Sequence, residues 1–279
     1  MFKTILVPTD GSEGSKKALF YAIHFAKIFG SVFKGLFVLD IKGLEGPFLQ
    51  DVAASVGAVP FSDYQGKIHT IMEERGKSIL KEFKKICDKN DVKSEIFFET
   101  GIVNKKICEA AHLADIIILG RQGEHAFIED FVLGSTAQSV MRGTHKPVIV
   151  VTNNCSDVIN NILVAYDGSD QAKEALAVAV NIAAERKNKL SLLIVEDDEA
   201  EQKNIFKQAK KYIEVYNVPF TEIMRTGDVS KAIIEEAKLQ KSDLIVMGSY
   251  SHSRLYNLFL GSITQHVLHE SNCPVLVIK

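Results

Sequence analysis

The stretch Ile5-Leu6-Val7-Pro8-Thr9-Asp10-Gly11-Ser12 occurs twice in this sequence, because it returns as Ile162-Leu163-Val164-Ala165-Tyr166-Asp167-Gly168-Ser169. Each copy starts with a short apolar run and ends in Asp, Gly and Ser, a pattern typical of a buried strand that leads through a tight turn into a helix. The similarity continues through the residues that follow. An internal repeat of this kind predicts two copies of one structural unit in a single chain.

The two copies match again near their carboxyl ends. Thr100-Gly101 corresponds to Thr226-Gly227, and Gly134-Ser135 corresponds to Gly261-Ser262. We therefore expect a first domain over residues 1–152 and a second over 158–279, each long enough to bury its own core. The first copy is longer in its middle, and we place the excess in a loop over residues 43–66, which is rich in Gly and Pro.

Short apolar runs alternate with helical patterns along the first copy. The expected strands are 4–7, 32–39, 94–99, 116–119 and 148–151, and the expected helices are 15–29, 67–90, 103–113 and 136–142. This alternation predicts an α/β fold in each copy, with an open, mostly parallel sheet and helices on both faces. The loops that follow the strands then meet at the carboxyl edge of the sheet, where such folds bind ligands. The linker between the copies is short, so we expect them to pack as a pseudo-symmetric pair.

Composition excludes several classes of protein. The net charge is -2 and neither copy is strongly basic, which argues against nucleic-acid binding. The four cysteines are scattered without a CxxC pair, which argues against structural zinc and a disulfide framework. The sequence has no apolar stretch of the roughly 20 residues that a membrane-spanning helix needs. We expect a soluble cytoplasmic protein with no membrane partner.

The loop after the first strand carries an acidic residue in each copy, Asp10 and Asp167. An aspartate at this position either caps the following helix or accepts hydrogen bonds from a ribose hydroxyl. The triplet Asp-Gly-Ser alone does not distinguish these two interpretations.

The loop after the fourth strand is more informative. In the first copy, Gly120-Arg121-Gln122-Gly123 is followed by ten residues and then by Gly134-Ser135-Thr136 at a helix start. In the second, Gly248-Ser249-Tyr250-Ser251 is followed by nine residues and then by Gly261-Ser262-Ile263. Glycines let backbone N–H groups approach phosphate oxygens, and a helix N-terminus attracts anions. The alternative is an ordinary glycine turn with a serine cap. Neither a Walker A motif nor a GxGxxG fingerprint is present, so a P-loop NTPase and a dehydrogenase are not expected.

With these motifs, and with the terminal Pro-Val strands at Pro147 and Pro274, each copy resembles the universal stress protein family over almost its full length. The resemblance implies five-stranded domains of the adenine nucleotide alpha hydrolase-like type, paired through their last edge strands. It also implies binding of ATP or AMP, a role in stress response or regulation, a protein partner of unknown identity, and a homodimer of the whole chain.

The resemblance also implies which positions form the nucleotide sites. Pro8, Thr9 and Asp10 would contact adenosine, and Val38 would lie beside the base. The floor and the phosphate site of the first copy would come from Leu119, Gly120, Gln122, Gly123, Gly134, Ser135 and Thr136. The matching positions of the second copy are Ala165, Tyr166, Asp167, Val195, Met247, Gly248, Tyr250, Ser251, Gly261, Ser262 and Ile263.

Both copies depart from the family pattern. The first has ten rather than nine residues between Gly123 and Gly134, and the second has Ser251 where the pattern has glycine. We favour the first copy as the nucleotide site, because it keeps Thr9, Asp10 and both loop glycines.

No catalytic residue is assigned from the sequence. Arg121 is interpreted as a counter-charge for phosphate, and Asp10 and Asp167 are candidates for holding Mg²⁺ together with the phosphates. The leading hypothesis is an adenine-nucleotide-binding regulatory protein with little or no turnover. The alternatives are a slow ATPase or phosphotransferase that uses the same loops and, from a different class, a flavin or electron-transfer module.

Overall fold

The structure is a computed structural model that describes residues 2–41, 61–123, 133–156, 158–249 and 260–279. Residues 43–60 of the expected loop at 43–66, and parts of both loops that precede the predicted phosphate sites, lie outside the described residues. Tyr250 and Ser251 are among them. The remainder of the expected loop, residues 61–66, is not a loop, because the helix that follows begins at Phe61 rather than at the expected residue 67.

The order of strands and helices repeats along the chain. The first half contains β1 (Thr4–Pro8), α1 (Glu13–Phe29), β2 (Val32–Asp40), α4 (Phe61–Lys89), β3 (Ser94–Gly101), α5 (Val103–Ala111), β4 (Ile116–Gly120), α6 (Ser135–Gly143) and β5 (Val148–Val151). The second half contains β6 (Asn161–Ala165), α7 (Asp170–Arg186), β7 (Lys189–Val195), α8 (Glu199–Val215), β8 (Phe220–Arg225), α9 (Val229–Leu239), β9 (Leu244–Gly248), α10 (Ser262–Glu270) and β10 (Val275–Ile278).

The strands form one ten-stranded sheet in the order β3-β2-β1-β4-β5-β10-β9-β6-β7-β8. Within each half the paired strands are parallel. The two halves meet where β5 and β10 pair antiparallel, with Ile149 opposite Leu276. The predicted fold class, two tandem α/β sheets joined by their last strands, is confirmed.

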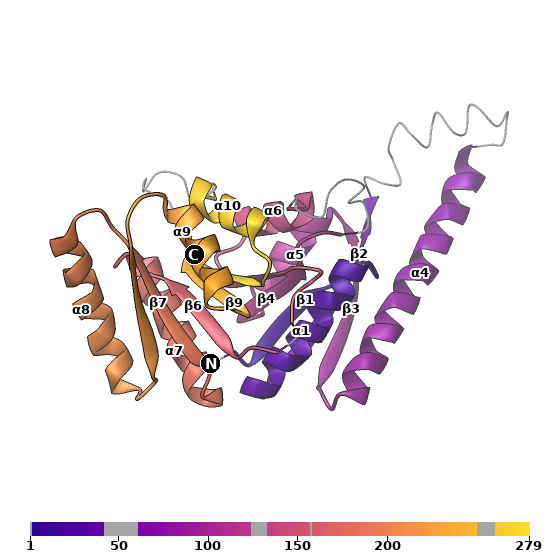
Figure 1. The fold of residues 1–279 in the computed structure, drawn as a ribbon. Coiled ribbons are helices and arrows are strands. Elements are labelled where there is room, and N and C mark those ends of the chain that lie inside the picture. Colours follow the sequence, from indigo (N-terminus) through magenta and orange to yellow (C-terminus); the bar gives the residue numbers. More distant parts are fainter. Residues whose placement is uncertain (1, 42–60, 124–132, 157, 250–259) are drawn as a thin grey trace.

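Helices cover both faces of this sheet (Figure 1). One hydrophobic cluster lies between the sheet and α1, α4, α7 and α8, and a second lies between the sheet and α5, α6, α9 and α10. Alternate residues of β1 show the division, since Ile5 and Val7 belong to the first cluster and Leu6 to the second. Strands that are buried on both faces explain the nearly continuous apolar runs in the sequence.

The helix that follows the second strand differs most between the halves. α4 has 29 residues, whereas its counterpart α8 has 17, and α4 extends well past the end of the sheet in Figure 1. α4 packs closely on β2 and β3 because it has a glycine at the contact. A Cβ atom on Gly76 would lie 2.4 Å from the ring of Phe37 and 2.7 Å from the ring of Phe98.

This contact predicts opposite effects for two alanine substitutions in α4. Gly76→Ala should lower the free energy of unfolding by about 1–3 kcal/mol, because the new methyl group overlaps two packed rings. Gly66→Ala should raise it by up to about 1 kcal/mol, because a Cβ atom there meets no neighbour within 4 Å and alanine favours a helix. Urea denaturation of both variants checks this pair, and equal stabilisation by both would contradict the packing described for α4.

Candidate functional site

A cavity of about 490 Å³ opens at the carboxyl ends of β1, β2 and β4 in the first half. Its volume lies within the range of roughly 300–1,000 Å³ that is typical of ligand sites. Most of the predicted site residues of this half line it, namely Pro8, Thr9, Asp10, Val38, Leu119, Gly120, Arg121, Gly123, Gly134, Ser135 and Thr136. Gln122 was also predicted as part of the floor, but it is not among the lining residues.

The turn that carries Asp10 is both a helix cap and a wall of the cavity. Asp10 Oδ1 accepts a hydrogen bond from the Ser12 amide at 3.0 Å, and Ser12 Oγ accepts one from the Ser15 amide at 3.2 Å. The other carboxylate oxygen lies beside the loop after β4, since a Cβ atom on Gly123 would be 2.8 Å from Asp10 Oδ2. Glycine at 123 therefore lets the loop backbone approach this carboxylate.

The N-terminus of α6 forms the opposite end of the cavity. Gly134 is the N-cap residue, and no side chain caps the first turn. The Gly134 amide itself donates to the Arg121 carbonyl at 2.8 Å, which closes the loop onto the end of β4. The N–H groups of an uncapped first turn, together with the hydroxyls of Ser135 and Thr136 at the cavity wall, suit an anion.

The side chain of Arg121 makes two hydrogen bonds with the other half of the chain. Its Nη1 atom donates to the His269 carbonyl at 3.1 Å and to the Ser271 carbonyl at 2.9 Å, at the carboxyl end of α10. The side chain is almost completely buried. These contacts favour a structural role at the junction of the two halves over the expected role as a phosphate counter-charge.

The corresponding cavity of the second half is smaller, at about 130 Å³. Six predicted residues line it, namely Ala165, Tyr166, Asp167, Val195, Met247 and Gly248. Gly261, Ser262 and Ile263 are not among the lining residues. The N-terminus of α10 is therefore not joined to this cavity in the part of the chain that the structure describes.

The second cavity is lined by Tyr166, which is bulkier than its counterpart Thr9 in the first. Tyr166 stands where the first half has Thr9, and it is almost fully buried, which raises the pKa of its hydroxyl and keeps that group neutral. Gln202 on α8 is also buried, and its amide donates to the Arg225 carbonyl at 2.9 Å. This hydrogen bond ties α8 to the end of β8.

The first cavity also contains residues that the sequence motifs did not indicate. Asp40 ends β2, Met72 and Arg75 lie on α4, and Asn104 lies on α5. Met72 and Arg75 reach the cavity because α4 packs closely against the sheet. No local sequence motif encodes this packing. Two glycines signal this close approach, Gly76 on α4 and Gly35 on β2, because a Cβ atom on Gly35 would lie 2.5 Å from the ring of Phe83 on α4.

The described residues also bear on metal binding and on membrane insertion. No group of three or more His, Cys, Asp or Glu side chains that could hold a metal ion occurs among them. None of the helices that the structure describes is long and apolar enough to cross a membrane.

The fold and the cavity define an open-sheet α/β protein with a ligand-sized cavity at the carboxyl edge of its first half. The Universal stress protein family matches residues 1–152, 159–214 and 194–279, and the chain belongs to this family. It is 26% identical to the universal stress protein Slr1230 of Synechocystis over 99% of this chain and 100% of that protein. It is 31% identical to the universal stress protein MJ0531 of Methanocaldococcus jannaschii over 54% of this chain and 82% of that protein.

A solved structure confirms the fold over the whole chain. A universal stress protein from Archaeoglobus fulgidus superposes with a TM-score of 0.79 at 24% identity, covering 99% of this chain and 98% of that one. The structural similarity therefore extends over both halves of the chain.

Arg121→Met should destabilise the nucleotide-free protein by about 1–3 kcal/mol, because two buried carbonyls at the end of α10 lose their donor. Arg186→Met is the control, since Arg186 is exposed in the last turn of α7. Urea denaturation measures both. Unchanged stability of Arg121→Met, combined with weaker nucleotide binding, would instead support the counter-charge interpretation.

Proposed function

We propose that this protein binds an adenine nucleotide, AMP or ATP, in the cavity of its first half and acts as a regulatory stress-response protein with little or no turnover. The observation that carries the proposal is the cavity of about 490 Å³ that runs from Val38 past Asp10 to the uncapped start of α6. An apolar wall, a carboxylate and a helix N-terminus follow one another in the order of base, ribose and phosphate.

The span of the cavity suits a nucleotide. Val38 lies on β2, and Gly120 ends β4, which is two strands away in the order β2-β1-β4. Neighbouring strands are about 4.8 Å apart, so these two walls are separated by roughly 10 Å. Asp10 follows β1, which lies between them, and its carboxylate is placed to accept hydrogen bonds from ribose hydroxyls.

Binding without turnover fits the groups that line this cavity. Its described lining residues include the carboxylates of Asp10 and Asp40 and the hydroxyls of Ser135 and Thr136, but no histidine. Phosphoryl transfer needs a nucleophile and cations fixed at the phosphate. Asp10 is placed to share a Mg²⁺ ion with a bound triphosphate, and in our proposal that ion supports binding.

The remaining family-based expectations belong to the same proposal. We propose that residues 1–152 and 158–279 are two domains of unequal function, the second serving mainly to complete the sheet and support the first. We also propose that the whole chain forms a homodimer and that the nucleotide changes its affinity for a protein partner.

Matched substitutions in the two halves test which site is used. Asp10→Ala should weaken AMP and ATP binding at least about tenfold, because a charged hydrogen-bond partner of the ligand is lost. Asp167→Ala should leave binding unchanged. The pair is well matched, because each Oδ1 atom accepts one hydrogen bond at 3.0 Å from the serine amide two residues on. Isothermal titration calorimetry should give one nucleotide per chain.

Equal loss of binding in the Asp10 and Asp167 variants, or two nucleotides per chain, would contradict the assignment to the first half. If calorimetry and mass spectrometry of the denatured protein both detect no nucleotide, the proposed function itself is wrong.

Turnover is tested separately by following ADP release from ATP in the presence of Mg²⁺. We expect release no faster than in a control without protein. Steady release that Asp10→Ala abolishes would replace our proposal with the slow ATPase.

A further inference from the structure

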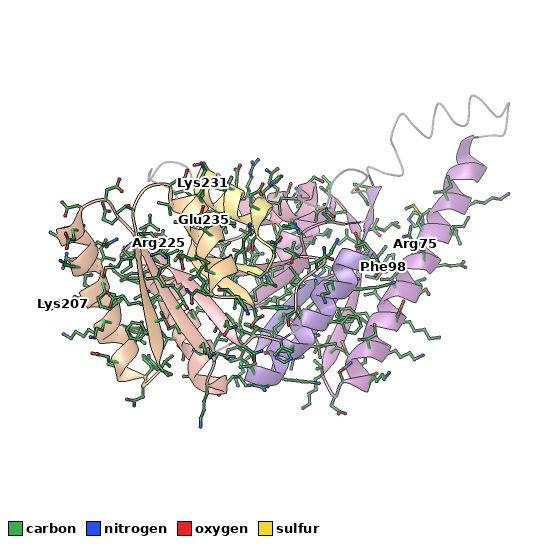
Figure 2. The ribbon with its side chains drawn as sticks, viewed as in Figure 1. Arg75, Phe98, Lys207, Arg225, Lys231 and Glu235 are labelled. Atoms are coloured by element: carbon green, nitrogen blue, oxygen red, sulfur yellow. The ribbon has the colours of Figure 1, made fainter. Side chains whose placement is uncertain are left out.

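The wall of the first cavity that α4 provides carries a cationic side chain, Arg75. This residue lines the cavity together with Met72 from the same helix and Asp40 from the end of β2. Figure 2 labels Arg75 on α4 close to Phe98 of β3. The adjacent Gly76 brings α4 against the rings of Phe37 and Phe98, so the backbone that carries Arg75 is held close to the ends of these strands.

Arg75 lies at the base end of the cavity rather than at its phosphate end. α4 packs on β2 and β3, whereas the helix N-terminus suited to phosphate follows β4. Between them lies β1, whose loop carries Asp10. A nucleotide placed with its phosphates at Gly134 and its ribose at Asp10 therefore directs its base toward Val38 and α4.

The chemistry of this wall suits a purine ring. A guanidinium group stacks on aromatic faces and donates hydrogen bonds in its own plane, and a methionine side chain packs readily against an aromatic ring. The described part of the cavity wall contains two cationic residues, Arg75 on α4 and Arg121 after β4.

The second half has no equivalent of this wall. Ile79 and Ile205 lie against the matching glycines Gly11 and Gly168, which aligns α4 with α8. By this alignment Arg75 corresponds to Glu201 and Gly76 to Gln202. An acidic residue thus replaces the cation, and a hydrogen-bonded glutamine replaces the glycine that allows the close approach.

We propose that Arg75 is a specificity-determining residue of the first site and that its guanidinium contacts the purine base of the bound nucleotide, with Met72 beside it. This inference rests on the proposed function. It adds a contact from α4, a helix outside the loops on which the nucleotide site was predicted, and it gives a further reason why the second half does not bind.

The test is calorimetry of the full chain with adenosine, AMP and ATP as separate ligands. Arg75→Gln should weaken all three by the same factor, about three- to tenfold, because the base is common to them. Arg75→Lys should give a smaller loss, since lysine keeps the charge but not the planar stack. Lys77→Gln is the control on the same helix, because Lys77 is exposed and pairs with Glu73, away from the cavity. Thermal unfolding should show that all three variants are folded.

The possible outcomes separate the two claims. If the unsubstituted chain binds none of the three ligands, the proposed function fails. If it binds them but Arg75→Gln weakens only ATP and AMP, Arg75 contacts phosphate and the base assignment is wrong. Unchanged binding of all three ligands in Arg75→Gln, or an equal loss in Lys77→Gln, overturns the role of Arg75 while leaving the nucleotide site in place.

Discussion

The antiparallel pairing of β5 with β10 is the interaction on which the rest of the structure depends. Both strands are completely buried at the centre of the sheet, and their three paired positions turn two parallel sheets into one. Without this pairing each half would expose a hydrophobic edge strand, which proteins avoid because such edges associate with other chains. The second half therefore has a structural function whether or not it binds a ligand.

Polar contacts on both sides of the β5–β10 pairing also hold the two halves together. Arg121 reaches across to the end of α10, and Lys279 Nζ donates to the Met141 and Arg142 carbonyls at the end of α6. Lys279 is half-buried at this contact, and burial lowers the pKa of its ammonium group. The carboxyl ends of α6 and α10 each thus receive a cation from the opposite half, where the helix dipole favours positive charge. Because the start of α6 is also the proposed phosphate site, these contacts between the halves help to hold the nucleotide site in place.

The carboxyl edge of the sheet differs between the two halves because the helix after β2, α4, differs from the helix after β7, α8. In the first half Gly76 allows a long helix to pack tightly and to provide a wall beside the strand ends. In the second half Gln202 replaces the glycine and bonds to the end of β8, and Tyr166 stands in the cavity wall. The cavity of the first half has a volume of about 490 Å³, whereas that of the second half has about 130 Å³. Duplication of one domain has left one half with room for a ligand and the other with a closed edge.

The sequence predicted the fold because the repeat, the buried strands and the helix caps are all encoded locally. The Asp-Gly-Ser triplets illustrate this, since both form the same capped turn. The positions of Asp10, Gly123 and Gly134 at one cavity also followed from topology. The partners of Arg121 did not, because they lie on a helix about 150 residues away that comes near only after the halves pair. The contribution of α4 depends likewise on tertiary packing.

A crystal structure of the full chain grown with AMP tests the central claim most directly, because it shows both halves at once. The account predicts nucleotide density in the first half, with the base beside Val38 at the α4 end of the cavity, the ribose at Asp10 and the phosphate at the start of α6. It predicts no nucleotide in the second half, where Tyr166 and Gln202 should keep the positions described above. A nucleotide bound in the second half alone, or in both halves with equal occupancy, would contradict it.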